Sequence, residues 1–400
     1  MDKKTFFPPF KQDIEPGEQP AKITPEIENL LRFIDIPEEE WNFILGLEHA
    51  YTPEKYLAIQ ERLLERGLKI ESLNDPSEDK KLFLKKAGVF SLFKNEEDLL
   101  LKKHIKKSYG GIYIRFPKDL KLKDSSLYLP SLLKFSYAPY PHTYIEFQEH
   151  SEGNITLGTP APRLVNFPNY LSTVEIIVKE GAKANISLIH AFPEYLDARV
   201  YTRILLEEDA SLTLSLLNFK NGKITCRDVG VTMGDRSSLT LNTLNFGTGD
   251  GKYYEWIEVS QEGEKSNALI NTRAVSMDTS SSNSFVKIRA QKGAHDSKAH
   301  IDSKGIVLSH DAEQFSLPAF ETEESRVKMS HSAYIGQIEE NTSLYLASRG
   351  LSDRDIVYVM AESYLDESLS KSLPRRFYTT MLKYLEYLLN TRKIEIIRRD

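Results

Sequence analysis

The sequence predicts a parallel β-helix enclosed between helical segments, and three observations lead to this fold class. The first is an identical string, Ser-Leu-Thr-Leu, which starts at Ser211 and again at Ser238, 27 positions later. The second is a recurrence of similar windows, each with a tight polar turn, at intervals near 28 residues between Val174 and Ile301. The third is helical spacing of apolar residues on both sides of this region. A constant period of this size is typical of a solenoid, in which each unit covers the next.

Each repeat has the two-residue periodicity of a β-strand. Leu212 and Leu214 alternate with hydroxyl residues, which places the leucines on one face and the hydroxyls on the other. Turn residues recur too: Ala182 and Ala210 occupy one position of the repeat, and Ala294 is expected to occupy it later. Because the units are too short for a crossover helix, we expect parallel coils about 4.8 Å apart. A β-sandwich or barrel is the alternative, although these folds seldom repeat one turn at a fixed long interval.

Changes in pattern divide the chain into four parts. Residues 1–23 are rich in Pro, Lys and Glu and are expected to be mobile. Residues 24–108 have apolar residues three and four apart and are expected to form an N-terminal helical domain. Residues 109–338 carry the β-helix, and residues 339–400 return to helical spacing. An apolar stripe in this last domain, which covers either the protein's own core or a partner, consists of Phe377, Met381, Leu382, Leu385, Leu388 and Leu389.

Composition and charge argue against several classes of function. The formal net charge is −6 with both signs well mixed, which does not indicate a nucleic-acid partner. No stretch approaches the roughly twenty apolar residues that span a membrane, and the N-terminus lacks the apolar core of a signal peptide. We therefore expect a cytoplasmic protein without a membrane partner. Cys226 is the only cysteine, which excludes an intrachain disulfide and a multi-cysteine metal site; we expect it to fill the core.

Two comparisons with enzyme motifs give no indication of catalysis. The segment from Gly247 to Lys252 superficially resembles a phosphate-binding loop, but its glycine spacing is wrong and Tyr253 follows where Ser or Thr is needed. We interpret it as a turn between coils, and we expect the chain not to hydrolyse nucleotide itself. Carbohydrate-cleaving β-helix enzymes use clustered acids, whereas the charges here are scattered. We therefore expect no enzymatic activity, with such an enzyme as the weaker alternative.

Four of the nine histidines fall within 37 positions near the end of the coil: His295, His300, His310 and His331. Imidazole is a good ligand for iron and zinc. The carboxylates that could complete a metal site are those of Asp296, Asp302 and Asp311. Histidines on solvated strands are also common, and no pair here has the i, i+4 spacing of a zinc-binding helix. The pattern alone leaves both interpretations open.

The run from Arg326 to Leu351 contains a longer pattern. Its matching residues are Val327-Lys328, Ser330-His331, Ala333, Ile335-Gly336-Gln337, Leu344-Tyr345-Leu346 and Ser348-Arg349-Gly350-Leu351. This pattern resembles the C-terminal signature of the SufB/SufD family of iron–sulfur cluster assembly scaffolds, and SufD-type members in particular. The run from Gly305 to Glu313 also looks like family sequence.

The resemblance implies a flattened right-handed parallel β-helix between helical ends, with C-terminal helices in residues 339–400 that dock an ABC-type ATPase, SufC. ATP would then be used only through that partner. The resemblance further implies that SufB and SufD pair through their coils and that a nascent cluster forms transiently at the junction. The partner at the coil would be a SufB-type subunit or a second copy of this chain.

Carried over residue by residue, the resemblance makes His331 the ligand of iron or of the cluster. The chain departs from the pattern at Met329, which stands where SufD-type chains have cysteine, and at Ala312, where SufB-type chains place one. Thioether is a poorer iron ligand than thiolate. The resulting hypothesis is a SufD-like subunit that is not itself an enzyme; the alternative is a purely structural homodimer that binds SufC without an iron site.

Overall fold

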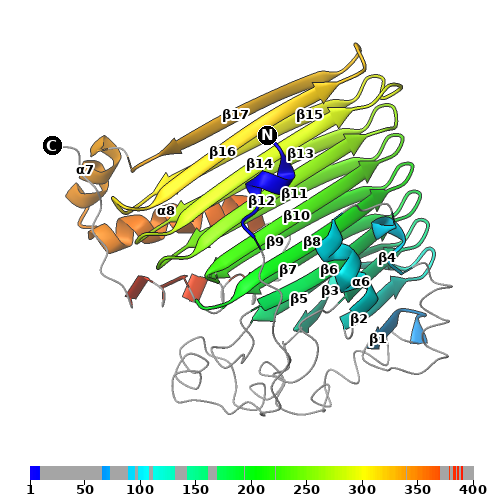
Figure 1. The fold of residues 1–400 in the computed structure, drawn as a ribbon, viewed down its shortest axis with the longest axis horizontal. Helices are drawn as coiled ribbons and strands as arrows, with labels where there is room; N and C mark the ends of the chain where they lie inside the picture. The colour runs from blue at the N-terminus through cyan, green and yellow to red at the C-terminus, as the bar shows by residue number, and fades with distance from the viewer. Residues whose placement is uncertain are drawn as a thin grey trace.

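The computed structural model describes residues 1–9, 65–72, 89–94, 98–107, 111–130, 142–160, 169–192, 194–220, 222–338 and 340–369, with 378, 382–383, 385–386 and 389–390 near the C-terminus. In these residues the chain forms two β-sheets whose strands alternate along the sequence, so that each coil contributes one strand to each sheet (Figure 1). Neighbouring strands are parallel in both sheets, apart from the first pair of the first sheet, β1 and β2. The predicted parallel β-helix is confirmed.

The first sheet consists, in spatial order, of β1 (Lys69–Ser72), β2 (Gly111–Phe116), β4 (His142–Phe147), β6 (Asn169–Val178), β8 (Asp197–Leu206), β10 (Ile224–Met233), β12 (Lys252–Gln261), β14 (Ser281–Ala290) and β16 (Glu313–Thr322). The second consists of β3 (Lys121–Pro130), β5 (Glu152–Pro160), β7 (Lys183–Ala191), β9 (Ser211–Lys220), β11 (Ser238–Gly247), β13 (Asn267–Ser276), β15 (Lys298–Val307) and β17 (Lys328–Gly336). The two sheets enclose the core between them.

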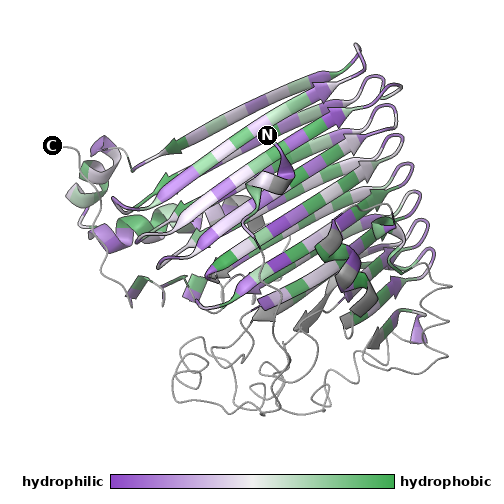
Figure 2. Cartoon of the chain, viewed as in Figure 1, coloured by the Kyte–Doolittle hydropathy of each residue, from purple (hydrophilic) through white to green (hydrophobic). Residues whose placement is uncertain are grey.

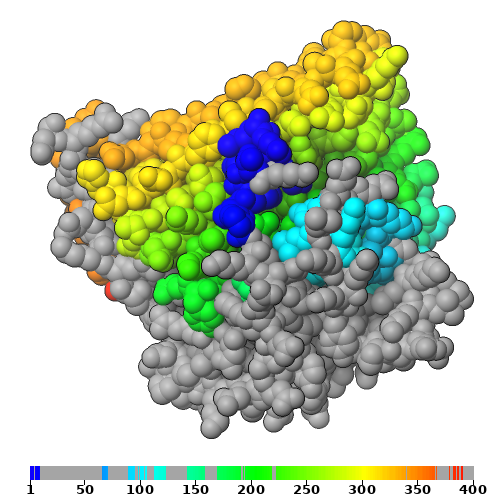
Figure 3. Space-filling view, in the orientation of Figure 1, coloured from blue at the N-terminus to red at the C-terminus, as the bar shows by residue number. Residues whose placement is uncertain are grey.

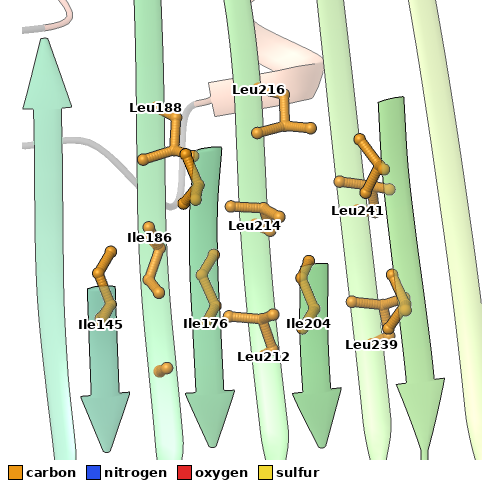
Figure 4. Close-up of a cluster of buried hydrophobic side chains, with 14 of the residues drawn as sticks. Ile145, Ile176, Ile186, Leu188, Ile204, Leu212, Leu214, Leu216, Leu239 and Leu241 are labelled. Carbon is orange, nitrogen blue, oxygen red and sulfur yellow. The ribbon is translucent and has the colours of Figure 1, made fainter. Parts of the chain in front are cut away.

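The repeated string determines the register of the central coils. Ser211 pairs with Ser238, and Leu212 with Leu239, so the two identical strings lie side by side in β9 and β11. Their leucines stack inside the coil on isoleucines of neighbouring strands (Figure 4). Figure 2 shows the resulting alternation of hydrophobic and hydrophilic positions along the strands. The two-residue periodicity read from the sequence is therefore the pattern of interior and exterior faces.

One turn is repeated at the end of the coil where the first sheet passes into the second. Its residues with a left-handed backbone are Asp119, His150, Gly181, Asp209, Arg236, Lys265 and Asp296. In the central coils the next residue is small and buried, as Ala182 and Ala210 are. The prediction for Ala294 is wrong: the register of Lys298 with Asn267 gives that position to Ser297. The loop that precedes β15 is longer than the earlier ones, and this length displaces Ala294.

Besides the stacked leucines, the interior of the coil contains a buried ionic cluster. Arg227 and Glu255 are each 2% exposed, with the guanidinium Nη1 3.7 Å from the carboxylate Oε1. The hydroxyls of Tyr253 and Thr243 donate to the same carboxylate over 2.8 and 2.9 Å. Arg227 also lies 3.1 Å from the ring Nδ1 of His190. Buried charges require such partners, because desolvation otherwise makes them costly.

The first nine residues differ from the mobile segment that their composition predicts. Helix α1 (Lys3–Phe6) lies across the outer face of the first sheet (Figure 3), where the ring of Phe6 packs against Trp256 and Phe285. The ammonium of Lys3 is 2.7 Å from the carboxylate of Asp228. Aromatic burial holds this segment on the coil, and a count of Pro, Lys and Glu does not reveal it. Residues 10–23 lie outside the described residues.

Residues 24–108, predicted to be helical, are described only in part. The 3₁₀ helix η1 (Ser91–Phe93) and helix α6 (Leu99–Lys107) pack on the outer face of the first sheet. The segment Lys69–Ser72 forms strand β1 instead, because it pairs with β2. The remainder of this prediction lies outside the described residues.

The C-terminal helices cover the outer face of the second sheet. Helix α7 (Glu340–Ser348) precedes helix α8 (Asp353–Leu369), which packs on β11 and β13. Leu385 and Leu389 are buried in the same cluster, so this part of the apolar stripe covers the protein's own core. Phe377, Met381 and Leu388 lie outside the described residues. Of the helices in the described part of the chain, none combines the length and apolar character needed to cross a bilayer.

Candidate functional site at the end of the coil

The last coil leaves its interior face uncovered. β16 and β17 are the terminal strands of their sheets, and no described strand lies beyond them. Interior positions that are fully buried in earlier coils are therefore partly or fully exposed here. Of the large apolar side chains exposed on these strands, Ile335 lies on the interior side, whereas Phe315, Leu317 and Tyr334 lie on the outer faces of the sheets. A strand edge and an exposed apolar face are the two features by which one β-sheet protein accepts another.

His331 lies on the interior side of this open end. Its register partner on β15 is Ile301, which is fully buried in the core, so the imidazole continues an interior column. The ring centroid is 5.6 Å from that of Phe320, which reaches the same space from β16. In the described part of the chain, no hydrogen bond or ion pair engages its ring nitrogens. An imidazole that is exposed in this way has both ring nitrogens accessible to a metal ion.

The other three clustered histidines are not brought to this point. His300 lies on the outer face, with Nδ1 2.9 Å from the hydroxyl of Ser330. His295 lies at the repeated turn, with Nδ1 2.8 Å from the carboxylate of Glu324. His310 is highly exposed in the turn before β16, at the other end of the coil. The clustering in the sequence is therefore not a clustering in space.

Asp302, one of the three carboxylates predicted as further metal ligands, is engaged by other residues of the protein. Asp302 accepts hydrogen bonds from Arg273 and Ser332, both over 2.6 Å. Although partial burial raises the pKa of Asp302, the Ser332 hydrogen bond and the Arg273 charge outweigh it and hold the pKa below its ordinary value. Among the described residues, no group of three or more His, Cys, Asp or Glu side chains is placed to hold a metal ion. Of the histidines predicted as ligands, the described coil end presents His331.

The positions that depart from the family pattern lie apart from each other. Met329 is on the interior side of β17, two residues from His331, and packs on the core. Ala312 is buried just before β16. It is eight residues from Phe320, the neighbour of His331, and eight residues correspond to about 26 Å along a strand. Cys226 is buried, and burial raises the pKa of its thiol to about 12, in agreement with the predicted core role.

The segment from Gly247 to Lys252 forms the turn between β11 and β12, as predicted. Gly249 has a left-handed backbone, and its N–H donates to the carboxylate of Asp278 in the next turn over 2.6 Å. The amide that a phosphate-binding loop would offer to a ligand is thus used within the protein.

A buried polar cluster beneath η1 and α6 was missed by sequence reasoning. The Nε2 of His104 and the Nδ1 of His142 each lie 2.8 Å from the hydroxyl of Thr173. The carboxylate of Glu175 accepts a hydrogen bond from the N–H of Leu92 over 2.7 Å. Burial, together with the nearby charge of His142, lowers the pKa of His104 to about 3. These residues come from separate elements, so no local spacing could have predicted the cluster.

Comparisons with known proteins agree with this architecture. The family described as "SUF system FeS cluster assembly, SufBD core domain" matches residues 136–362. An iron–sulfur cluster assembly SufBD family protein of Pyrococcus horikoshii is 27% identical over 370 residues, 91% of this chain and 81% of the relative. One from Methanothermobacter thermautotrophicus is 26% identical over 230 residues, 57% of this chain and 56% of that protein. One from Staphylococcus aureus is 22% identical over 392 residues, 94% and 81% of the two chains.

The matched segment contains the coils from β4 to β17, helix α7 and the first part of α8, and therefore includes the open end with His331. It covers more than half of the chain. The chain belongs to the SufBD family of iron–sulfur cluster assembly proteins.

Proposed function

We propose that this protein is a SufD-like subunit of an assembly scaffold and that its open coil end is where a nascent iron–sulfur cluster is held against a partner chain. The observation that supports this is the position of His331: it is an interior residue of the coil, yet it is exposed to solvent, and among the described residues no further coil covers it. One imidazole supplies one bond to iron, so the remaining ligands of the cargo would come from the partner and from sulfide.

The C-terminal helices supply the second contact in this proposal, with a SufC-type ABC ATPase. On α7 the side chains of Leu344 and Tyr345 are 52% and 57% exposed, whereas α8 is fixed to the second sheet by Ile356 and Val357. The exposed apolar patch on α7 is suited to docking a partner. Because α8, the next helix, is packed on the second sheet, a movement of the docked partner would be transmitted to the coil. ATP would bind and be hydrolysed by the partner, and this chain would act as a scaffold without catalysis of its own.

Anaerobic co-purification with SufC-type and SufB-type partners, followed by iron and sulfide analysis, tests the role of His331. His331→Ala should lower the iron retained by the complex several-fold while the complex still assembles. His300→Ala is the matched control, because this histidine lies on the next strand but faces outward. Equal iron content in wild type and His331→Ala would exclude the ligand role.

The alternative is a structural subunit that binds the ATPase without handling iron. Met329 favours it, since a thioether occupies the interior position beside His331 where a thiolate would bind iron better. In that case neither wild type nor variant would retain iron, although the ATPase would still be captured.

A further inference from the structure

The single cysteine of the chain is buried on the outer side of the first sheet. The guanidinium of the next residue, Arg227, points into the ionic cluster between the two sheets, so the side chain of Cys226 points away from the interior. Its register partners are Arg199 on β8 and Tyr254 on β12. A residue on the outer face of a sheet is buried only where another element packs on it. The 2% exposure of Cys226 therefore requires a cover.

Residues 1–9 supply this cover. The ring centroid of Phe6 lies 5.9 Å from that of Tyr254, and the guanidinium carbon of Arg199 lies 5.6 Å from the ring centroid of Phe7. Both strand neighbours of the cysteine thus contact the segment, which lies on the surface of the molecule (Figure 3). The cysteine is therefore enclosed between the sheet and these rings, in a small apolar core outside the coil.

The segment is held to the coil by side chains and not by strand pairing. No part of residues 1–9 belongs to either sheet, and the main-chain hydrogen bonds donated by residues 5–7 stay within the segment. Its anchors are the buried ring of Phe6, the ion pair of Lys3 with Asp228, and the hydrogen bond that Arg199 donates to the carbonyl of Pro8. A terminal segment held in this way lifts from a sheet at a lower free energy than unfolding of the sheet requires. Opening exposes the cysteine and leaves the coil intact.

We propose that residues 1–9 act as a strap that shields Cys226 and keeps the only thiol of the chain from binding iron unproductively. Iron–sulfur clusters are held mainly by cysteine thiolates, so an accessible Cys226 would compete for the iron that cluster assembly uses. In the described part of the chain, the cysteine belongs to no group of three or more His, Cys, Asp or Glu side chains that could hold a metal ion. Iron captured there would therefore not be part of a complete site.

The chemical state of the thiol depends on the strap. With the strap closed, burial raises the pKa of Cys226 to about 12, so the thiol keeps its proton and is a poor metal ligand. The charge of Arg199 lowers this pKa, whereas the carboxylates of Asp197 and Asp228 raise it. Release of the strap removes the burial, which is the largest of these effects. The pKa of the thiol then falls toward its ordinary value, and the sulfur becomes reactive.

Closure is favoured by the apolar surface beneath the strap. Phe6 covers Trp256 and Phe285, which are 2% and 5% exposed and are register partners on β12 and β14. The same row continues on β16 with Leu317, whose side chain is 39% exposed. An open strap would extend this exposed apolar patch by two aromatic side chains, and the hydrophobic effect therefore returns the strap to the closed state.

Labelling of the thiol by a maleimide, in the native full-length chain, tests the strap. Phe6→Ala removes the ring that anchors the segment and should be labelled at least about tenfold faster than the wild type, because the open form becomes more populated. Phe315→Ala is the matched control. It removes an exposed ring at the far end of the row that contains Cys226, and it should leave the rate unchanged. Cys226→Ala gives the background.

Lys3→Glu opens the strap in a second way. It places a carboxylate against that of Asp228 and should also accelerate labelling. The midpoint of coil unfolding, measured by denaturant titration, should stay the same in Phe6→Ala and Lys3→Glu. Labelling of both variants at the wild-type rate would refute the cover. Faster labelling that accompanies a lowered midpoint would assign the exposure to unfolding of the coil, and the strap would be refuted in that case too.

Iron retention tests the protective role. After anaerobic incubation with Fe²⁺ and sulfide, followed by gel filtration, Phe6→Ala should retain more iron than the wild type. Combining Phe6→Ala with Cys226→Ala should abolish this excess. Fast labelling without excess iron would overturn the protective role. His331→Ala should leave the excess unchanged, so this result is separate from the test of the open coil end.

Discussion

The Nε2 atom of His142 lies 3.2 Å from the carboxylate of Glu175, and both side chains are sealed beneath η1 and α6. If Glu175 accepts this contact as an anion, His142 presents Nδ1 as an acceptor to the hydroxyl of Thr173. That hydroxyl then accepts from Nε2 of His104, so one tautomer of each neutral imidazole satisfies the chain of contacts. The cluster joins the N-terminal elements to the coil through Thr173.

We predict that acid releases α6 from the coil before it unfolds the coil itself. Burial lowers the pKa of His104 from 6.5 to about 3, so the released form binds protons more readily than the docked form. The contribution of this group to docking is therefore complete only well above pH 6.5, and it is lost progressively as the pH falls through 6.5 toward 3. Between pH 6.5 and 4.5 the loss should be about 2.3 kcal/mol for this one group. Hydrogen exchange of residues 99–107, measured at both pH values, checks it.

His104→Gln is the matched control for the pH effect, because an amide can still bond to Thr173 but does not titrate. Its docking should show a smaller dependence on pH than that of the wild type. An equal increase in exchange in both proteins would show that another group controls release.

Removing one leucine from an interior column should destabilise the coil strongly. Leu214 is fully buried and stacks on Leu241 of the next coil, so Leu214→Ala leaves a cavity between two repeats. We expect a loss of about 2–5 kcal/mol in the free energy of unfolding, measured by denaturant titration. Thr213→Ala changes the neighbouring exterior position and should cost much less. A similar cost for both would contradict the assignment of the two faces.

The buried cation of the interior should matter more than a cation at the turns. Arg227→Ala leaves the carboxylate of Glu255 without its ionic partner in the core and should cost about 3–5 kcal/mol in unfolding free energy. Arg236→Ala removes an exposed ion pair with Asp209 and should change stability little. Denaturation of both variants under one condition gives the comparison. A near-neutral Arg227→Ala would mean that water or rearrangement compensates the charge.

The exposed patch on α7 should control capture of the ATPase. Leu344→Glu combined with Tyr345→Ala should reduce recovery of a SufC-type partner at least tenfold without a change in stability, since both side chains are exposed. Val359→Glu, on the exposed side of α8, is the control. This design is sharper than deletion of residues 339–400, because α8 also covers the core and its loss would unfold the second sheet. Full recovery with the double variant would place docking elsewhere.

The repeated part of the fold could be predicted from the sequence because each coil of a solenoid has the same pattern of strands and turns. The paired strings at Ser211 and Ser238 define a register, and the alternation of Leu212 and Leu214 with hydroxyl residues defines the faces. Ala294 shows where prediction from the period fails. A longer loop before β15 shifts the apparent period of the sequence, whereas the strand pairing is unchanged. A period is a reliable guide only where the loops have constant length.

The candidate site was harder to predict because it depends on β16 and β17 being the terminal strands of their sheets in the described part of the chain. The position of His331 came from the resemblance, while its interior orientation required the pairing with Ile301. The clustering of histidines along the chain was misleading, because successive residues of a strand point to opposite faces of the sheet. Register, rather than proximity in sequence, determines which side chains meet.

The attachment of α8 has a mechanical consequence. Its buried cluster contains side chains from five neighbouring strands of the second sheet: Ile189, Leu217, Leu244, Val275 and Ile306. A load applied to the C-terminal helices is therefore shared across several strands in parallel, instead of peeling β17 away one hydrogen bond at a time. A pull or twist at the helices would move the end of the coil as a single stiff body.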